Sequence, residues 1–428
     1  MRTIAPADLD LATLIKPGEA IVCTQGSGEP ITLMETLAAQ RHALPGCSVF
    51  VGASFARTFQ REHADTLRFL SFGALGTNRG LAKAGVLGLI PCHVARLGPY
   101  FTTGTLACDV LFVQLSPPGE DGRHSLGATA DYVRAASSKA RLVIAEINDQ
   151  APITHGDPGL STDEIDIAVP TSRPLVQVQA APPAATDLAI AEHAARFIED
   201  GAVLHLGIGA TPDAILRLLH DRRNIGIHSG MISDSVVDLM QSGVVTNAGK
   251  PVDPGVTVTG AMIGTQRLFD FAHRNQLIAL RSSAHTHGDA VLGQLDRLVT
   301  INAAIEVDLT GQVNAEQIGD DYLGAIGGQA DYVRAGQRAA HGHAIIALPA
   351  SAKGGTISRI VPRLTSAVTT ARADVDVIVT EFGAAVLRGQ TLAERARRII
   401  SIADPAFREG RSDRIILKMH GTANSLLL

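Results

Sequence analysis

The feature that most constrains this fold is a strand, a glycine-containing loop and a helix that occur twice. Near the N-terminus, apolar residues 20–24 predict a buried strand, and the loop 26–30 (GSGEP) leads into apolar residues at helical spacing. Residues 202–206 repeat the strand, and the loop 207–212 (GIGATP) precedes a second helix. Each unit is followed by another strand with a small-residue turn, the second one at 224–230. The repetition favours an internal duplication.

The rest of the chain continues to alternate strands with helices. The predicted strands lie at 110–115, 142–147, 344–348 and 375–379, and residues 392–402 predict a basic amphipathic helix. This alternation predicts an α/β fold of two related domains with mostly parallel sheets. The proline-containing stretch 173–186 is the best linker candidate, which gives domains at 1–180 and 188–428. Because ligands bind at the carboxyl ends of parallel strands, we expect an active-site cleft between the domains.

Composition narrows the class of protein. The 428 residues carry 37 Lys and Arg against 42 Asp and Glu, and 46% are hydrophobic, which excludes a disordered chain and makes nucleic acid an unexpected partner. No apolar run is long enough for a membrane span, and the N-terminus lacks a signal-peptide pattern, so we expect a cytoplasmic protein. The four cysteines stand in apolar surroundings without a CxxC pair, which predicts buried free thiols.

The second glycine loop is suited to an anion. Gly207, Ile208, Gly209 and Ala210 let the backbone approach a ligand, and the positive end of the following helix dipole faces it. We expect Thr211 to cap this helix and the proline after it to take the first helical position. The spacing is not GxGxxG, so a site for a phosphate, thioester or oxyanion is favoured over nicotinamide binding, with a structural turn as the alternative.

Two later loops have similar chemistry. Gly327 and Gly328 could present backbone amides to a developing oxyanion. Lys353, Gly354 and Arg359 follow a predicted strand and suit a pyrophosphate or a 3′-phosphate, and a solvated basic loop is the equal alternative. The histidine pairs at 285–287 and 341–343 lack further ligands at metal spacing, so no metal is expected.

Taken in order, several motifs resemble the acetyl-CoA hydrolase/transferase family, a single-chain branch of the class I CoA-transferases that includes 4-hydroxybutyrate CoA-transferases. The matching segments are GSGEP (26–30), LSPP (115–118), SLG (125–127), AEIN (145–148), LGIGATPD (206–213), IEVDLTGQVN (305–314), GGQADYVR (327–334) and VTEFG (379–383). The resemblance spans nearly the whole chain. It implies two related α/β domains, coenzyme A or acyl-CoA as a substrate in the cleft, a carboxylic acid as a possible second substrate, and a homodimer or larger homo-oligomer.

One position departs from the family pattern. The resemblance implies a nucleophilic glutamate in a motif of the form His-Ser/Thr-Glu-Met-x-Ser-Asp, but residues 228–234 read HSGMISD, with Gly230 at that position. A second departure is Ala279, where relatives usually carry a glutamate. Glycine has no side chain that could attack a thioester, so the glutamyl-anhydride route cannot run through position 230.

Three hypotheses remain open. The first is an enzyme that acts on an acyl-CoA thioester without a covalent anhydride, by hydrolysis, C–C cleavage or acyl transfer. Its general base would be Glu29, His228, Asp234 or Glu306, and Glu29 is favoured because it sits in the glycine loop of the opposite half. The second is a CoA-transferase that uses a substitute carboxylate. The third is a non-catalytic subunit that binds CoA.

Overall fold

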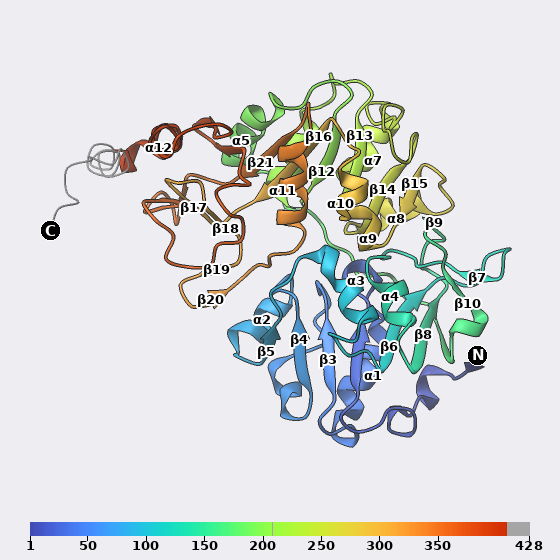
Figure 1. Cartoon of the computed structure of the whole chain (residues 1–428). Coiled ribbons are helices and arrows are strands. Elements are labelled where there is room, and N and C mark those ends of the chain that lie inside the picture. The colour runs from blue at the N-terminus through green and yellow to red at the C-terminus, as the bar shows by residue number, and fades with distance from the viewer. Residues whose placement is uncertain (208, 409–428) are drawn as a thin grey trace.

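The first half of the chain forms a parallel sheet. The computed structural model describes residues 1–207 and 209–408 (Figure 1). Eight strands pair in the order β1-β11-β8-β6-β2-β3-β4-β5, every pair parallel. Their bounds are β1 Arg2–Thr3, β2 Ala20–Cys23, β3 Ser48–Val51, β4 Arg68–Ser71, β5 Leu87–Leu89, β6 Val110–Leu115, β8 Leu142–Asn148 and β11 Ile167–Thr171.

The second half forms a nine-stranded sheet in the order β26-β25-β21-β16-β12-β13-β14-β15-β9. Its pairs are parallel except the hairpin of β25 with β26. The strands are β9 His155–Gly156, β12 Val203–Leu206, β13 Gly226–Ile232, β14 Thr257–Met262, β15 Ile278–Leu280, β16 Leu298–Ala303, β21 His343–Ala347, β25 Val377–Thr380 and β26 Gly383–Val386.

The two sheets share one strand order. Reading β11-β8-β6-β2-β3-β4-β5 against β25-β21-β16-β12-β13-β14-β15 matches seven strands one to one, with β2 opposite β12 and β3 opposite β13. The fold is therefore α/β with two related units, as the repeated loops predict. The boundaries 1–180 and 188–428 stay a prediction. The strand β9 comes from the first half of the chain but pairs with β15 of the second sheet.

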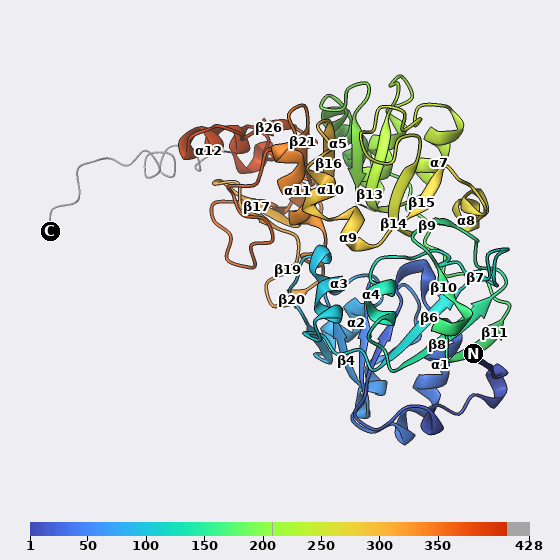
Figure 2. The same cartoon turned by 45° about the vertical axis from the view of Figure 1, so that its right-hand side comes forward.

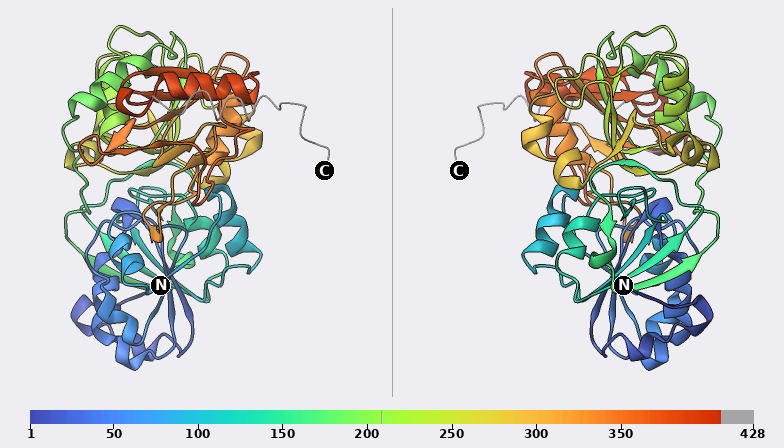
Figure 3. Two further views of the ribbon diagram at one scale, coloured as in Figure 1. Left: turned by 90° about the vertical axis from the view of Figure 1, so that its left-hand side faces the viewer. Right: turned by 90° about the vertical axis from the view of Figure 1, so that its right-hand side faces the viewer.

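Helices cover the sheets (Figures 2 and 3). They are α1 Ile31–Gln40, α2 Asn78–Lys83, α3 Val94–Thr102, α4 Val133–Ser137, α5 Ala185–Ala195, α6 Ala210–Arg217, α7 Asp234–Gln241, α8 Gln266–Ala272, α9 Ser283–Thr286, α10 Asp289–Leu292, α11 Gln329–Arg338 and α12 Leu392–Ser401. The central strands are buried apolar runs, as expected for a parallel sheet covered on both faces. None of the described helices combines the length and apolar character that crossing a bilayer requires. The four cysteines are buried and free, which confirms the predicted thiols.

Short strands build four smaller sheets: β7 Arg123–His124 with β10 Leu160–Ser161, the group of β17 Glu306–Asp308, β18 Val313–Asn314 and β24 Ile360–Val361, the pair β19 Gln317–Ile318 and β20 Asp321–Tyr322, and the pair β22 Ser351–Ala352 and β23 Ile357–Ser358. The β19–β20 hairpin reaches from the second half to α2 of the first half (Figure 1). It carries Gly324 and Gly327 to the first half, where their carbonyl oxygens accept hydrogen bonds from the backbone N–H of Ala74 and Val94 at 2.8 and 3.0 Å.

The two sheets meet at their carboxyl ends. A Cβ atom built on Gly26, in the loop after β2, would lie 2.7 Å from Cδ1 of Ile263, the residue after β14. The backbone N–H of Ala130 donates to the carbonyl of Gly260 at 2.9 Å, and that of Met262 donates to the carbonyl of Ala128 at 2.9 Å. Loops from both halves therefore close one junction, where strand topology predicts a site.

Three local expectations were wrong. Gly230 does not lie in a turn after β13 but inside the strand, because Met231 and Ile232 continue the pairing with β14. Thr211 does not cap α6, since its hydroxyl hydrogen bonds to Asp187 Oδ1 of α5. Gly209, at a φ of 133°, is the N-cap residue instead, and Pro212 is the third helical residue.

Candidate active site

Gly230 is buried, and an imidazole ring fills the space beside it. A Cβ atom built on Gly230 would lie 2.7 Å from Cε1 and 2.8 Å from Nε2 of His287, and 3.7 Å from Cε2 of Tyr332. Approaches below 3.0 Å to a buried ring leave no room for a side chain. The histidine follows α9, and its side chain lies over β13.

A second glycine borders the same Nε2 end of this ring. A Cβ atom built on Gly328, just before α11, would lie 2.4 Å from Nε2 and 2.6 Å from Cδ2 of His287. Gly230 and Gly328 come from different elements, and together they leave a slot for one imidazole. We call this arrangement of Gly230, His287 and Gly328 the imidazole slot.

Neighbouring side chains fix the ring within the slot. The Nδ1 atom of His287 lies 2.8 Å from Thr286 Oγ1. Tyr332 of α11 packs edge-on against His287, with ring centroids 4.8 Å apart, and its hydroxyl donates to the Thr286 carbonyl at 2.7 Å. The other face of Tyr332 stacks on His205 at 3.4 Å between centroids. Burial, and to a lesser extent nearby His228, lowers the pKa of His287 to about 3, so the ring is neutral at physiological pH.

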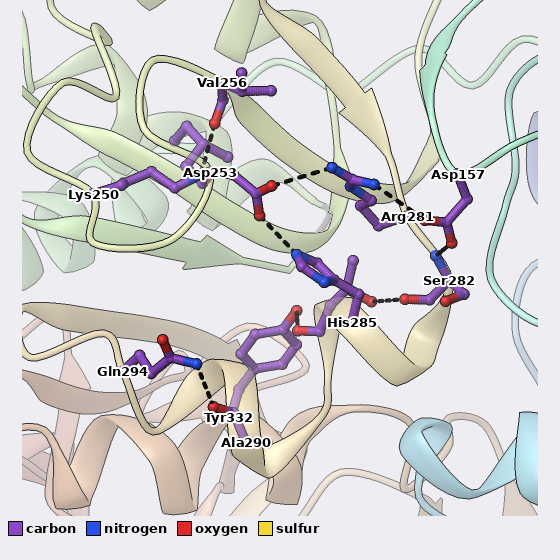
Figure 4. Close-up of polar contacts among 12 residues, drawn as sticks. Asp157, Lys250, Asp253, Val256, Arg281, Ser282, His285, Ala290, Gln294 and Tyr332 are labelled. Carbon is purple, nitrogen blue, oxygen red and sulfur yellow. Dashed lines mark hydrogen bonds and ion pairs between the residues drawn. The ribbon is translucent and has the colours of Figure 1, made fainter.

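The candidate base His228 lies two residues before Gly230 on β13 and is fully buried. Burial lowers its pKa to about 3, with Lys250 as the next cause. Its ring faces His285 at 5.7 Å between centroids. His285 Nε2 in turn lies 2.7 Å from Asp253 Oδ2, as Figure 4 shows.

Ligand-type atoms of His228, Asp253 and His285 lie within 4.8 Å of one another, a spacing that a metal ion could use. Both oxygens of Asp253 are already engaged, one by His285 and one by Arg281 Nη2 at 3.2 Å (Figure 4). The Lys250 ammonium adds positive charge next to His228 and Asp253. We therefore interpret the group as an ion-pair cluster.

Glu29 is turned into the first half. Its carboxylate accepts hydrogen bonds from Ser54 Oγ and from the backbone N–H of Phe55 and Ala56, the latter two at 2.9 and 3.0 Å. It is 1% exposed, and burial raises its pKa to about 7. The contacts of this carboxylate hold it to the loop after β3, and its role as a base stays a prediction.

The other two candidate carboxylates lie on separate elements. Asp234 begins α7 and accepts hydrogen bonds from Thr265, from the backbone N–H at 2.9 Å and from the hydroxyl at 2.7 Å. Glu306 begins β17 and is half-buried. Ala279, the second departure from the family pattern, lies inside β15, paired with Val258 and His155. The catalytic roles of Asp234 and Glu306 stay predictions.

The predicted binding loops fall into three places. Gly207 and Gly209 stand between β12 and α6, Ala210 is the first residue of α6, and Ile208 lies outside the described residues. Gly327 and Gly328 precede α11 at the junction of the halves. Three further residues belong to the β22–β23 hairpin and the link to β24, namely Lys353, Gly354 and Arg359. Lys353 is exposed. The backbone carbonyl of Arg359 accepts a hydrogen bond from the backbone N–H of Val307, the residue after Glu306.

Sequence reasoning missed four buried residues at the junction: His205, His287, Tyr332 and Asp131. The carboxylate of Asp131 hydrogen bonds to Gln25 Nε2. A Cβ atom built on Gly260 would lie 2.4 Å from Asp131 Oδ1 and 2.9 Å from the carbonyl oxygen of Gly230. Burial raises the pKa of Asp131 to about 6. The His-x-His pair at 285–287 was a sequence signal for His287. The contact of His287 with Gly230 is visible only in the packing of the structure.

Comparisons with known proteins agree with this architecture. Residues 6–178 match the acetyl-CoA hydrolase/transferase N-terminal domain, and residues 264–413 match the C-terminal domain of that family. The chain is 38% identical over 399 residues to 4-hydroxybutyrate coenzyme A transferase of Clostridium kluyveri, covering 91% of this chain and 92% of the relative. It is 34% identical over 403 residues to succinyl-CoA:cyclohexane-1-carboxylate CoA transferase of Geobacter metallireducens, covering 94% and 92%. The crystal structure of RipA from Yersinia pestis has a TM-score of 0.90 at 30% identity, covering 98% of this chain and 97% of that chain.

Duplicated parallel sheets that meet at their carboxyl ends, with glycine loops at the junction, define a two-domain α/β enzyme of the CoA-transferase type. The chain belongs to the acetyl-CoA hydrolase/transferase family.

Proposed function

We propose that this enzyme hydrolyses an acyl-CoA thioester without forming an enzyme-bound anhydride. The observation that carries the proposal is the imidazole slot: position 230, where the family resemblance places the nucleophilic glutamate, is a glycine, and His287 fills the space beside it. A covalent route needs a nucleophilic side chain, and none can be accommodated there while the ring is in place. Water, by contrast, needs only an oriented thioester and a proton acceptor.

The same proposal assigns the thioester-binding elements. Gly207 and Gly209 precede α6 and Ala210 is its first residue, at the N-terminus whose dipole favours an anionic group. Gly327 and Gly328 supply backbone amides for the oxyanion. Lys353 and Arg359 supply positive charge for the phosphates of CoA. These roles, the homodimeric or larger assembly and the cytoplasmic location stay predictions.

The test measures release of free CoA thiol from acetyl-, propanoyl-, butyryl- and succinyl-CoA, with and without acetate as an acceptor. Hydrolysis that does not depend on acetate supports the proposal. The same samples are treated with borohydride or hydroxylamine and digested, and peptides with a modified carboxylate are sought by mass spectrometry. An adduct on a peptide with Glu29, Asp131 or Glu306, together with transfer to acetate, identifies a transferase with a substitute carboxylate and contradicts the proposal.

The remaining alternative is a subunit that binds CoA without turnover. Calorimetric titration with coenzyme A separates it from the enzyme hypothesis. Binding of CoA without thiol release from any thioester in the panel contradicts hydrolysis and supports the binding role. Cleavage of the C–C bond in a β-keto acyl-CoA to a carboxylic acid and a shorter acyl-CoA, without thiol release from the simple thioesters, identifies the cleavage variant of the first hypothesis.

A further inference from the structure

We propose that His287 is the catalytic base of this hydrolysis and accepts the proton of the attacking water at Nε2. The inference rests on the proposed function, because it assumes that water is the acyl acceptor. It goes further because it names the proton acceptor that activates water, next to position 230, where the family resemblance implies the nucleophile. The observations that carry it are the location of the ring, the orientation of its two nitrogens and the glycines that border it.

The location follows from Gly230. Nε2 of His287 lies 2.8 Å from the point where the Cβ atom of a residue at position 230 would stand. A side chain at 230 would start at this point, so the imidazole lies directly beside its first carbon. The ring comes from the C-terminal end of α9, 57 positions further along the chain than Gly230. His287 therefore places an imidazole next to position 230, where glycine has no side chain of its own.

The orientation follows from Thr286. Its hydroxyl has one proton and donates it to the carbonyl of Ser282 at 3.3 Å. In this arrangement the hydroxyl oxygen accepts from Nδ1 of His287 at 2.8 Å, and we propose the tautomer of the neutral ring with its proton on Nδ1. The lone pair is left on Nε2. Among the described residues, the hydrogen bond of this ring is made at Nδ1 and none is made at Nε2.

The loop next to Nε2 bears on the second requirement of hydrolysis, which is stabilisation of the oxyanion. Gly328 borders Nε2, so the loop predicted to stabilise an oxyanion lies against the same atom that would accept the proton. A base and oxyanion donors within one slot are the two parts that thioester hydrolysis needs. Tyr332 packs against the ring, and its hydroxyl holds the Thr286 carbonyl, which makes it a positioning residue. Burial keeps the ring neutral, so its lone pair is available before substrate binds.

The step balances without a further reactant. The oxygen of water forms a bond to the thioester carbonyl carbon, one water proton moves to Nε2, and the electron pair of the C=O bond moves to the carbonyl oxygen. Collapse restores C=O and breaks the C–S bond, and the proton on Nε2 moves to the thiolate sulfur. The products are the carboxylic acid and CoA with a free thiol. The imidazolium exists only while the oxyanion faces it, which offsets the cost of charging a buried ring.

The experiment compares three forms of the full chain on the acyl-CoA panel: wild type, His287→Asn and His285→Asn. Asparagine keeps a polar side chain of similar reach but cannot act as a base. We expect His287→Asn to lower kcat by about 100-fold or more, the typical share of a general base, with a KM and a calorimetric affinity for coenzyme A within about threefold of wild type. His285→Asn, which removes the other imidazole of the same helix, should keep kcat within about threefold.

Chemical rescue separates a base from a merely structural ring. His287→Gly opens the slot, and free imidazole at tens of millimolar should then restore kcat by about tenfold or more, with no such gain for His285→Gly. Unchanged kcat in His287→Asn, with an active wild type, overturns the role of His287 and leaves hydrolysis standing. Absence of rescue in a His287→Gly variant that still binds coenzyme A also overturns it. A wild type that hydrolyses none of the thioesters instead contradicts the proposed function, and this inference with it.

Discussion

Gly230→Ala adds one methyl group to β13 and tests the imidazole slot directly. The added carbon would approach Cε1 and Nε2 of His287 to 2.7 and 2.8 Å, whereas carbon atoms in a well-packed core stand about 3.5–4.0 Å apart. The ring cannot shift freely, because Gly328 also borders its Nε2 end and Thr286 holds Nδ1. Either the ring or the strand must therefore shift by close to an ångström.

Overpacking of this kind costs about 1–3 kcal/mol in a rigid core, and we expect about 2 kcal/mol for Gly230→Ala. In a His287→Ala background both close approaches are removed, and the approach to Cε2 of Tyr332 at 3.7 Å is an ordinary contact, so the cost should vanish. The double-mutant cycle should thus yield a coupling free energy of about 2 kcal/mol between the two positions. Gly98→Ala is the matched control, since its Cβ atom enters a buried site whose nearest neighbour lies at 3.6 Å.

Calorimetric melting is the suitable assay because the chain has no Trp to report unfolding by fluorescence. At about 2–4 °C per kcal/mol, Gly230→Ala should lower the Tm of the second half by about 4–8 °C. Gly98→Ala should leave Tm unchanged or raise it slightly. A Gly230→Ala variant that melts within about 1 °C of wild type, or one equally destabilised with and without His287, would refute the placement of the ring.

Three further predictions concern the site. Gly230→Glu alone should give no CoA transfer to acetate, whereas Gly230→Glu with His287→Gly should gain transfer measurable by acyl exchange; gain in the single variant contradicts the slot. Burial raises the pKa of Glu29 to about 7, so the stability that its protonated form contributes is present below about pH 4.5 and is lost as pH rises through 7. The Tm of Glu29→Gln relative to wild type should therefore rise between pH 5 and 8. A difference in Tm that stays constant over this range contradicts the shift. Lys353→Ala and Arg359→Ala should raise the KM for acyl-CoA by about tenfold with little change in kcat, and an unchanged KM removes these residues from the phosphate site.

Local patterns predicted much of the fold. Residues 110–115 form β6 with those bounds. A strand of a parallel sheet covered by helices is buried on both faces, so a continuous apolar run predicts it. Residues 392–402 predict the helix that is observed as Leu392–Ser401, since apolar and basic residues alternate at the helical period. The repeated glycine loops predicted two related sheets because each loop has to leave a strand and enter a helix.

The candidate site was harder to predict because its contacts are long-range. Glu29 was expected to face the second half, but local partners, Ser54 and two backbone amides, hold its carboxylate in the first. Those partners follow β3, and a sequence pattern does not reveal that a loop some 25 residues away supplies three donors. The loops at Lys353 and Arg359 were identified by charge alone, and charge does not specify which strand the hairpin will border.

The relation between Gly230 and His287 bears on the glutamate that the family resemblance implies at position 230. Viewed in the sequence, glycine at position 230 is a loss, and an enzyme that has lost a nucleophile could regain it by one substitution. Viewed in the structure, the glycine is one wall of a slot whose other wall is Gly328 and whose occupant is His287. A side chain at position 230 and the ring of His287 compete for the same space, so these two positions have to change together. Reversal therefore needs at least two substitutions, and an intermediate with only one of them is either overpacked or left with an empty slot.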